Sequence, residues 1–224
     1  MIIIGCDTYL CKVIFRLTDD LIFPPPHLAE DDGLLAVGGD LSAERLTLAY
    51  SQGIFPWFSD ETPILWYSPH ERFVIFPDKV KISKSMRKVL SSGTFQITVN
   101  TVFAKVIEAC ANAKRNEQDG TWITADMQKA YIQLHQQGVA HSVEVWQNDE
   151  LVGGLYGVQT ETVFCGESMF STISNASKVA LIWLCQNKGY TLIDCQFHTE
   201  HLESMGAEFV TRDEYMGFIN SKSL

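Results

Sequence analysis

Two carboxylic acids and one amide lie in apolar stretches of the second half of the chain. Glu167 belongs to the run 165–170, and Asp194 ends the apolar run 192–194 shortly before Gln196. On a strand, Asp194 and Gln196 share one face about 7 Å apart, so we expect their side chains to converge on one polar site at the end of the strand. Because glutamine is a weak base, Gln196 suits the orientation of a nucleophile better than the removal of its proton.

Glu167 needs a partner, because a carboxylate inside an apolar strand is at least half buried. Two sources of that partner remain open. An ammonium or guanidinium group of a substrate can supply it, and so can an internal lysine or arginine. The carboxylate of Asp194, which ends an apolar strand, needs a partner for the same reason.

Neither the histidines nor the glycines predict a metal or phosphate site. His198 and His201 are three residues apart, but no third ligand follows at a recognisable spacing, so we expect no metal. No phosphate-binding loop is present, and we expect no cofactor. The glycines of the predicted strands mark either bulges at a ligand or close strand packing: Gly153, Gly154, Gly157 and Gly166.

The net charge of −10 argues against a nucleic-acid partner when it is taken as a whole. The charge is unevenly distributed, however. Residues 79–115 carry 8 basic residues and only one acid, Glu108, whereas the segments on both sides are strongly acidic. Four of these basic residues lie on or beside a predicted helix over 83–90: Lys81, Lys84, Arg87 and Lys88. This cluster is either a phosphate-binding surface or an ordinary solvated helix face.

Several aromatic residues lie in or near proline-flanked loops, namely Trp57, Trp66, Tyr67 and Trp122. They either cover an edge of the core or stack on a nucleic-acid base, and their spacing leaves both interpretations open.

The chain of 224 residues is 46% hydrophobic, which is typical of a globular protein with one core or with two packed domains. All 7 prolines lie between Pro24 and Pro77. We therefore predict a turn-rich N-terminal domain over 1–72 and a second domain of regular structure over 73–224. No apolar run is long enough to cross a membrane, and the six cysteines have no CxxC spacing, so we expect a cytosolic protein with reduced thiols.

Local signals predict the elements of the second region. Asn100, Thr124 and Asn175 are expected to cap helices, and Gly138 and Gly189 to end the second and third of these. Strands are predicted over 141–146, 151–158, 162–169 and 191–195, with a turn at 147–150, followed by a short helix and a last strand and helix. This series predicts an α/β or α+β fold with a mixed sheet.

Nine motifs, in order along the chain, resemble those of the leucyl/phenylalanyl-tRNA–protein transferases. Two of them are Gly166-Glu167-Ser168-Met169-Phe170-Ser171 and Leu192-Ile193-Asp194-Cys195-Gln196, and the others span 33–41, 53–58, 66–69, 120–123, 141–146, 151–157 and 175–178. The resemblance covers most of the chain. Two departures are conservative: Trp66-Tyr67 stands where the family often has two tryptophans, and Leu155 where some members have methionine.

The resemblance implies a GNAT-like acyltransferase domain over 73–224 in an enzyme that acts on two substrates, and we expect a monomer. Members move Leu or Phe, and Met less well, from aminoacyl-tRNA to the α-amino group of proteins that begin with Arg or Lys. That transfer marks the proteins for N-end-rule degradation. An aminoacyl ester is already activated, so its aminolysis needs mainly alignment and charge stabilisation.

The motifs also imply roles for individual residues. Asp194 would orient Gln196, Gln196 would position the attacking amine, and Glu167 would help to hold the acceptor. The resemblance implies an adenosine site at Trp57 and Trp122 with Tyr131 nearby, and an apolar pocket for the aminoacyl side chain formed by Leu155, Phe164, Met169, Leu184 and Ile193.

Two other functions remain to be weighed. An acetyltransferase that uses acetyl-CoA would need a glycine-containing turn at a helix N-terminus, and the segment 172–178 has no glycine. An RNA-binding module without catalysis would use the basic cluster alone, and it would leave Glu167, Asp194 and Gln196 without a role.

Overall fold

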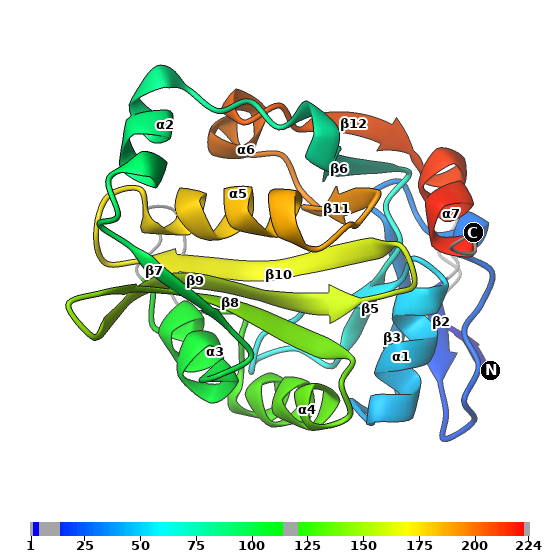
Figure 1. The fold of residues 1–224 in the computed structure, drawn as a ribbon. Helices are drawn as coiled ribbons and strands as arrows, with labels where there is room; N and C mark the ends of the chain where they lie inside the picture. Colours follow the sequence, from blue (N-terminus) through cyan, green and yellow to red (C-terminus); the bar gives the residue numbers. More distant parts are fainter. Residues whose placement is uncertain (1, 5–13, 114–120, 222–224) are drawn as a thin grey trace.

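The computed structural model describes residues 2–4, 14–113 and 121–221, which form two mixed sheets with helices packed around them (Figure 1). The predicted α/β architecture is therefore confirmed. Some residues of the sequence analysis lie outside the described residues. They are Lys114 and Arg115 of the basic segment, Gly120 of the motif 120–123, and two of the cysteines, Cys6 and Cys11.

The first sheet contains only strands from the first 67 residues, in the order β1-β2-β3-β5-β4. Its elements are short, as the prolines predict, and η1 has a proline in its first turn. The α-helix α1 begins after Ser42, whose side chain accepts a hydrogen bond from the N–H of Arg45. The elements of this part are β1 (Ile2–Ile4), β2 (Ile14–Leu17), η1 (Pro26–Leu28), β3 (Leu34–Gly38), α1 (Ala43–Ser51), β4 (Phe55–Pro56) and β5 (Leu65–Tyr67).

The second sheet has the order β12-β6-β11-β10-β9-β8-β7. Its strands β7 to β10 form an antiparallel series, and β11 runs parallel to β10 after the crossover helix α5. The strands are β6 (Glu71–Ile75), β7 (Gln96–Val99), β8 (Ala140–Gln147), β9 (Glu150–Gln159), β10 (Val163–Ser171), β11 (Leu192–Asp194) and β12 (Glu208–Thr211). The remaining elements are η2 (Pro77–Lys79), α2 (Lys84–Ser91), α3 (Phe103–Ala111), α4 (Ala125–Gln136), α5 (Ala176–Asn187), α6 (Glu200–Ser204) and α7 (Arg212–Asn220).

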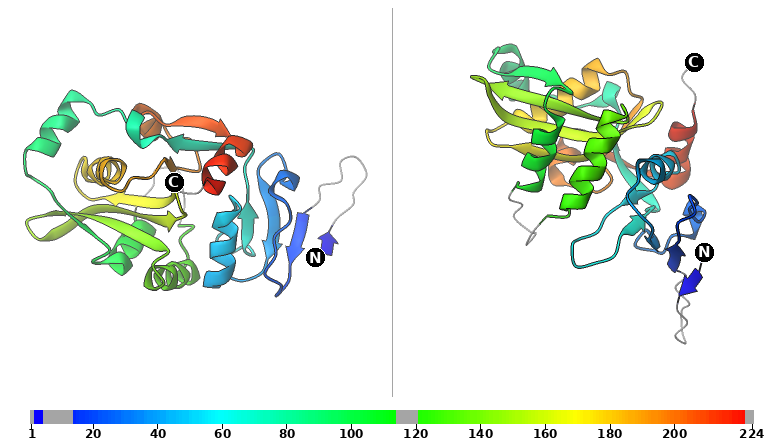
Figure 2. Two further views of the ribbon diagram at one scale, coloured as in Figure 1. Left: turned by 45° about the vertical axis from the view of Figure 1, so that its right-hand side comes forward. Right: turned by 90° about the horizontal axis from the view of Figure 1, so that it is seen from below.

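Helices cover the two faces of the second sheet. The helices α3 and α4 pack on one face, and α5 packs on the other, against β8, β9 and β10 (Figure 1). Figure 2 shows the first sheet and α1 beside this layered body, near α4 and α7. The boundary at residue 72 stays a prediction, and β6 runs across that position.

Most of the predicted elements are confirmed, but the helix cap predicted at Asn100 is wrong. Thr124 caps α4, and Gly138 follows its end with a φ of 76°. Asn100 does not cap α3, because its side chain accepts from the N–H of Ser142 and contacts His141; the N-cap position is Val102. Asn175 occupies the N-cap position of α5 as predicted, with a φ of 74°, although its side chain forms no cap hydrogen bond.

The described cysteines are all free thiols, and Cys110, Cys165 and Cys185 are buried. Burial raises the pKa of the Cys185 thiol to about 12. These residues therefore behave as small apolar side chains, as predicted. Within the described residues, no helix is both long and apolar enough to span a membrane.

Candidate active site

A cavity of about 320 Å³ lies where the loop after β4 meets the middle of β10 and the end of β11. Most of the side chains that line it are apolar, and five of them come from four different elements: Leu155, Phe164, Met169, Leu184 and Ile193. These are the five residues that the resemblance assigns to the aminoacyl pocket, so the fold brings the set together. Glu167, Asp194 and Gln196 line the same cavity and supply its polar groups.

Glu167 enters the cavity from a bulge in β10. The register between β9 and β10 shifts between Gly166 and Ser168, so Glu167 has no paired residue across the ladder. The glycines of β9 serve packing rather than a ligand: a Cβ at Gly157 would lie 2.2 Å from the carbonyl oxygen of Cys165, and one at Gly153 would lie 2.6 Å from Ala176.

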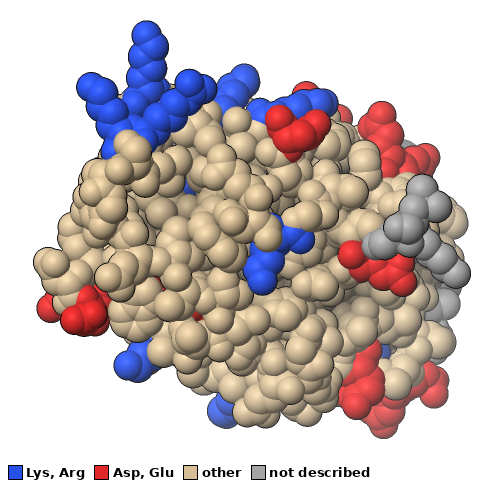
Figure 3. Space-filling model, viewed as in Figure 1, with Lys and Arg blue, Asp and Glu red and all other residues tan. Residues whose placement is uncertain are grey.

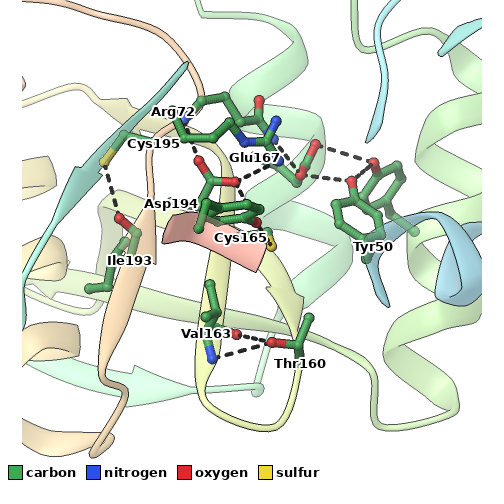
Figure 4. Close-up of polar contacts among 12 residues, drawn as sticks. Tyr50, Arg72, Thr160, Val163, Cys165, Glu167, Ile193, Asp194 and Cys195 are labelled. Atoms are coloured by element: carbon green, nitrogen blue, oxygen red, sulfur yellow. Dashed lines mark hydrogen bonds and ion pairs between the residues drawn. The ribbon is translucent and has the colours of Figure 1, made fainter. Parts of the chain in front are cut away.

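The buried carboxylate of Glu167 is held by three uncharged donors (Figure 4). Its Oε1 accepts from the Tyr50 hydroxyl at 2.7 Å and from Gln196 Nε2 at 2.9 Å, and its Oε2 accepts from the Tyr131 hydroxyl at 3.2 Å. The two tyrosine hydroxyls also contact each other. Among the described residues no lysine or arginine forms an ion pair with Glu167, and the three hydrogen bonds supply its partners instead.

Burial raises the pKa of Glu167 to about 7, although hydrogen bonds from Tyr50, Tyr131 and Gln196 oppose this shift. The negative charge of Asp194 raises it further. A carboxyl group of this pKa exchanges a proton near neutral pH, which is the property that a general acid or base requires.

Asp194 has the internal partner that Glu167 lacks. Its fully buried carboxylate forms an ion pair with Arg72 at 2.9 Å and accepts from the Tyr215 hydroxyl at 2.8 Å (Figure 4). The Arg72 guanidinium lies 4.7 Å from the ring centroid of Phe55 and 4.6 Å from that of Tyr215. Burial disfavours the charged form of Arg72, but Asp194 outweighs this and raises the arginine pKa.

Gln196 and Asp194 converge by a different route from the one predicted. The strand β11 ends at Asp194, and Gln196 has a φ of 63° instead of an extended backbone. The prediction of a strand through 195, and hence of alternating side chains on one strand face, is therefore wrong. The turn nevertheless directs the backbone N–H of Gln196 to Asp194 Oδ1 at 2.8 Å and its side-chain amide to Glu167.

The aromatic residues separate into core and cavity sets. Trp66 is fully buried and donates to the carbonyl of Gly38, so it belongs to the core. Trp57 and Trp122 line the cavity, and the ring of Trp57 lies 5.1 Å from that of Phe197. Tyr131 is fully buried and does not line the cavity; it lies beneath Glu167 and contacts it through the hydroxyl.

Three residues of the basic cluster share the outer face of α2. Lys84, Arg87 and Lys88 are exposed, whereas Met86 of the same helix is buried. Lys81 precedes the helix and is also exposed. Figure 3 shows a concentration of basic side chains over this end of the molecule, while acidic residues gather mainly at the opposite side.

The histidine pair forms no metal site in the described part of the chain. His198 contacts Glu203 at 2.9 Å, and no group of three potential ligands occurs among the described residues.

Sequence reasoning missed Tyr50, Arg72 and Tyr215, which support the polar groups. One signal was present for Arg72, because it directly precedes the apolar run 73–75 as a charged residue in a buried strand. Tyr50 and Tyr215 lie on apolar helix faces, where a tyrosine is ordinarily a core residue.

Comparison with known proteins gives a consistent result. The family model described as leucyl/phenylalanyl-tRNA protein transferase matches residues 74–220, and the model for the N-terminal domain of the same family matches 39–70. The chain is 56% identical over 206 residues to the leucyl/phenylalanyl-tRNA–protein transferase of Syntrophobacter fumaroxidans, covering 91% of this chain and 88% of that one. It is 52% identical to the protein of the same name from Flavobacterium johnsoniae, covering 93% and 100%.

Solved structures similar to this one include a GCN5-related N-acetyltransferase from Kribbella flavida. The match has a TM-score of 0.37 and 8% sequence identity, and it covers 72% of this chain and 58% of that one.

Proposed function

The chain belongs to the leucyl/phenylalanyl-tRNA protein transferase family, an aminoacyltransferase family, and we propose that it transfers leucine or phenylalanine, and methionine less well, to proteins that begin with Arg or Lys. The acceptor is the α-amino group, and the transfer marks the protein for N-end-rule degradation. Since aminoacyl-tRNA is a cytoplasmic substrate, we expect the enzyme to act in the cytoplasm, as a monomer.

One observation carries the proposal. An apolar cavity of about 320 Å³ ends at a buried carboxylate that has three hydrogen-bond donors and no cationic partner among the described residues. The apolar part suits a leucyl or phenylalanyl side chain. The carboxylate suits an ammonium group next to it. An enzyme that joins an apolar aminoacyl group to an amine needs these two features side by side.

Aminolysis of the aminoacyl ester forms one bond and breaks another. The acceptor nitrogen bonds to the ester carbonyl carbon, the bond from that carbon to the ribose oxygen breaks, and the ribose oxygen takes up the proton that the nitrogen loses as the amide forms. The amine must first lose the proton of its ammonium form. An α-ammonium group has a pKa of about 8, so transfer of that proton to Glu167, whose pKa is about 7, costs only about 1 kcal/mol.

Gln196 is suited to orient the amine. Its Nε2 donates to Glu167, so its carbonyl oxygen is the side-chain atom that remains to accept a hydrogen bond from an N–H group in the cavity. Asp194 fixes the turn through the backbone N–H of Gln196, and Arg72 compensates the charge of Asp194. Asp194 is therefore a positioning residue in this proposal, and it acts through Gln196.

The aminoacyl end of the donor tRNA is proposed to lie between two parts of the cavity. One is the aromatic rim, formed by Trp57 and Trp122, and the other is the apolar floor, formed by Leu155, Phe164, Met169, Leu184 and Ile193. Trp57 and Trp122 offer ring faces for the terminal adenosine, and stacking of one base is worth about 1–3 kcal/mol. Tyr131 acts on this site only through its hydrogen bond to Glu167. The exposed Lys84, Arg87 and Lys88 would contact tRNA phosphates, with Lys81 beside them.

An apolar pocket explains why more than one amino acid is accepted. Such a pocket discriminates between side chains that differ by a methylene by only about 1–3 kcal/mol, so leucine, phenylalanine and methionine can all enter. The order of preference among them follows from the shape of the cavity rather than from any polar contact, because the five floor residues are apolar.

The acceptor specificity can be tested with peptides that differ only at the N-terminus. With leucyl-tRNA as donor, we expect leucine to be added to peptides beginning with Arg or Lys, and neither to a peptide beginning with Ala nor to the Nα-acetylated Arg peptide. Equal transfer to the Ala peptide would contradict the proposed specificity for Arg and Lys. Transfer to the acetylated peptide would contradict attack by the α-amine.

A further inference from the structure

A second cavity, of about 210 Å³, lies on the other side of α5 and α6 from the aminoacyl cavity. The two cavities share these helices as a partition. Leu181 and Leu184 of α5 line the first cavity, whereas Lys178 and Ile182 of the same helix line the second. The opposite wall comes from the chain before and within α2, with Lys81, Ser83 and Met86.

This second cavity is cationic. Lys81 and Lys178 line it, and none of its lining residues is an aspartate or glutamate. Among the described residues neither lysine has a carboxylate within ion-pair distance, as the ion pairs of the described lysines involve Lys79 and Lys129. In a chain with 17 basic and 27 acidic residues, two unpaired lysines that share a cavity without an acid favour an anion strongly.

Both lysines are held in place by the surrounding structure. The backbone N–H of Lys81 donates to the carbonyl of Met205 at 2.8 Å, and its side-chain stem packs on Gly206, where a Cβ would lie 3.3 Å from Lys81 Cγ. Gly206 also has a φ of 97°, which an L side chain rarely adopts.

Lys178 lies in the first turn of α5 and is half buried. Burial lowers the pKa of His201 in α6, and the charge of Lys178 lowers it further. The packed stem of Lys81 and the half-buried side chain of Lys178 therefore lose less conformational freedom on ligand binding than fully free lysines would.

We propose that this cavity binds a backbone phosphate of the aminoacyl-tRNA, as a subsite that includes Lys178 in addition to the basic face of α2. The inference rests on the proposed function. Continuity favours a polynucleotide over a free anion, because the exposed Lys84, Arg87 and Lys88 of α2 directly follow Lys81 and Ser83, which line the cavity. A phosphate held by Lys178 is anchored to the helix that also lines the aminoacyl cavity, which links tRNA binding to the placement of its aminoacyl end.

The test compares Lys178→Met with Lys188→Met. The methionine keeps the apolar stem, and Lys188 is an exposed lysine at the other end of the same helix. The affinity for leucyl-tRNA is measured by filter binding from 50 to 300 mM KCl. We expect Lys178→Met to bind about tenfold more weakly, with a salt slope smaller by about 1, and Lys188→Met to bind like the wild type.

A second donor separates a phosphate contact from a structural effect. Leucine transfer is measured from leucyl-tRNA and from 3′-leucyl-adenosine, which has no backbone phosphate. The loss in kcat/KM caused by Lys178→Met should be about tenfold larger with leucyl-tRNA than with leucyl-adenosine. Equal losses with both donors would overturn the inference.

Two further results would also overturn it. One is an unchanged affinity for leucyl-tRNA in Lys178→Met. The other is a Lys178→Met protein that no longer binds inorganic phosphate in calorimetry but binds tRNA as the wild type does. That result would assign the cavity to a free anion. Failure of the proposed function can be distinguished from failure of the phosphate subsite. If the proposed function were wrong, the wild type itself would transfer no leucine from leucyl-tRNA.

Discussion

The side-chain amide of Gln196 donates to the buried carboxylate of Glu167 over 2.9 Å, although the two residues come from different segments of the chain. This bond fixes which atom of the Gln196 amide faces the cavity. It also connects the Glu167 cluster to Asp194, through the backbone N–H of the same glutamine.

Replacement of Gln196 by alanine should therefore impair the chemical step more than donor binding. We expect Gln196→Ala to lower kcat for leucine transfer about 10²-fold, because a positioned polar group is lost, with little change in the KM for leucyl-tRNA. Steady-state kinetics measures both values. Gln186→Ala, at an exposed position of α5, is the matched control. A rise in KM without a fall in kcat would show that Gln196 binds the donor instead.

Asp194 should matter for stability as well as for activity. Asp194→Ala leaves Arg72 buried without a counter-charge, which costs roughly 3–5 kcal/mol of unfolding free energy. Urea unfolding measures the change, and the double variant Arg72→Met, Asp194→Ala should recover most of it. Both variants should lose transfer while they retain affinity for tRNA. Stability of the single variant equal to that of the wild type would contradict the role of the ion pair.

Glu167 should make the folded protein less stable as the pH rises. Its pKa is about 7 in the folded protein and has a usual value of 4.5, so the folded state holds the proton more tightly than the unfolded chain. The stabilisation is complete below pH 4.5 and is lost as the pH rises through 7. Relative to Glu167→Gln, the wild type should therefore lose up to about 3 kcal/mol between pH 4.5 and 8.

Urea unfolding at several pH values tests this dependence. Glu161→Gln removes an exposed carboxylate from the turn before β10 and controls for the change in net charge. The difference between the wild type and Glu167→Gln should grow with pH, whereas the difference between the wild type and Glu161→Gln should stay small. A constant difference between the wild type and Glu167→Gln would show that the buried carboxyl keeps an ordinary pKa.

The apolar cavity should set the choice of amino acid. Met169 lines the cavity and is only half buried, so Met169→Phe narrows the space without filling a packed core. We expect kcat/KM to fall about tenfold more for phenylalanyl-tRNA than for leucyl-tRNA, because the larger side chain meets the added ring first. Parallel assays with the two charged tRNAs measure the ratio. An equal loss for both donors would place the aminoacyl side chain elsewhere.

The basic face of α2 should dominate the salt dependence of tRNA binding. Reversal of Lys84, Arg87 and Lys88 to glutamate should weaken tRNA binding and flatten the plot of affinity against salt, because fewer counterions are released. Filter binding over a range of KCl concentrations measures the slope. Reversal of Lys105 and Lys129, which are exposed on α3 and α4, is the control. Unchanged binding would make the cluster an ordinary solvated helix face.

Local features of the fold could be predicted from the sequence. Thr124 and Gly138 delimit α4 as expected, and the strands over 141–158 form the expected hairpin, because caps, alternation and turn residues act over a few positions. The cap at Asn100 was predicted wrongly because a contact with the distant Ser142 competes for its side chain. Tertiary contacts decide such cases.

The site could be predicted only in part. Glu167, Asp194 and Gln196 stand out because they are polar residues in or next to apolar strands. Their partners do not stand out, since Tyr50 approaches Glu167 from 117 positions away. The turn at Gln196 was missed for another reason: nothing in Asp194-Cys195-Gln196 indicates a positive φ at a residue other than glycine.

The proposed transfer reaction depends most on the identity of the acyl donor. The decisive measurement is the mass of a peptide that begins with Arg after incubation of the enzyme with leucyl-tRNA in one reaction and with acetyl-CoA in another. We expect the addition of one leucine to the α-amino group in the first reaction and no change in the second. Acetylation of the peptide without any transfer of leucine would contradict it.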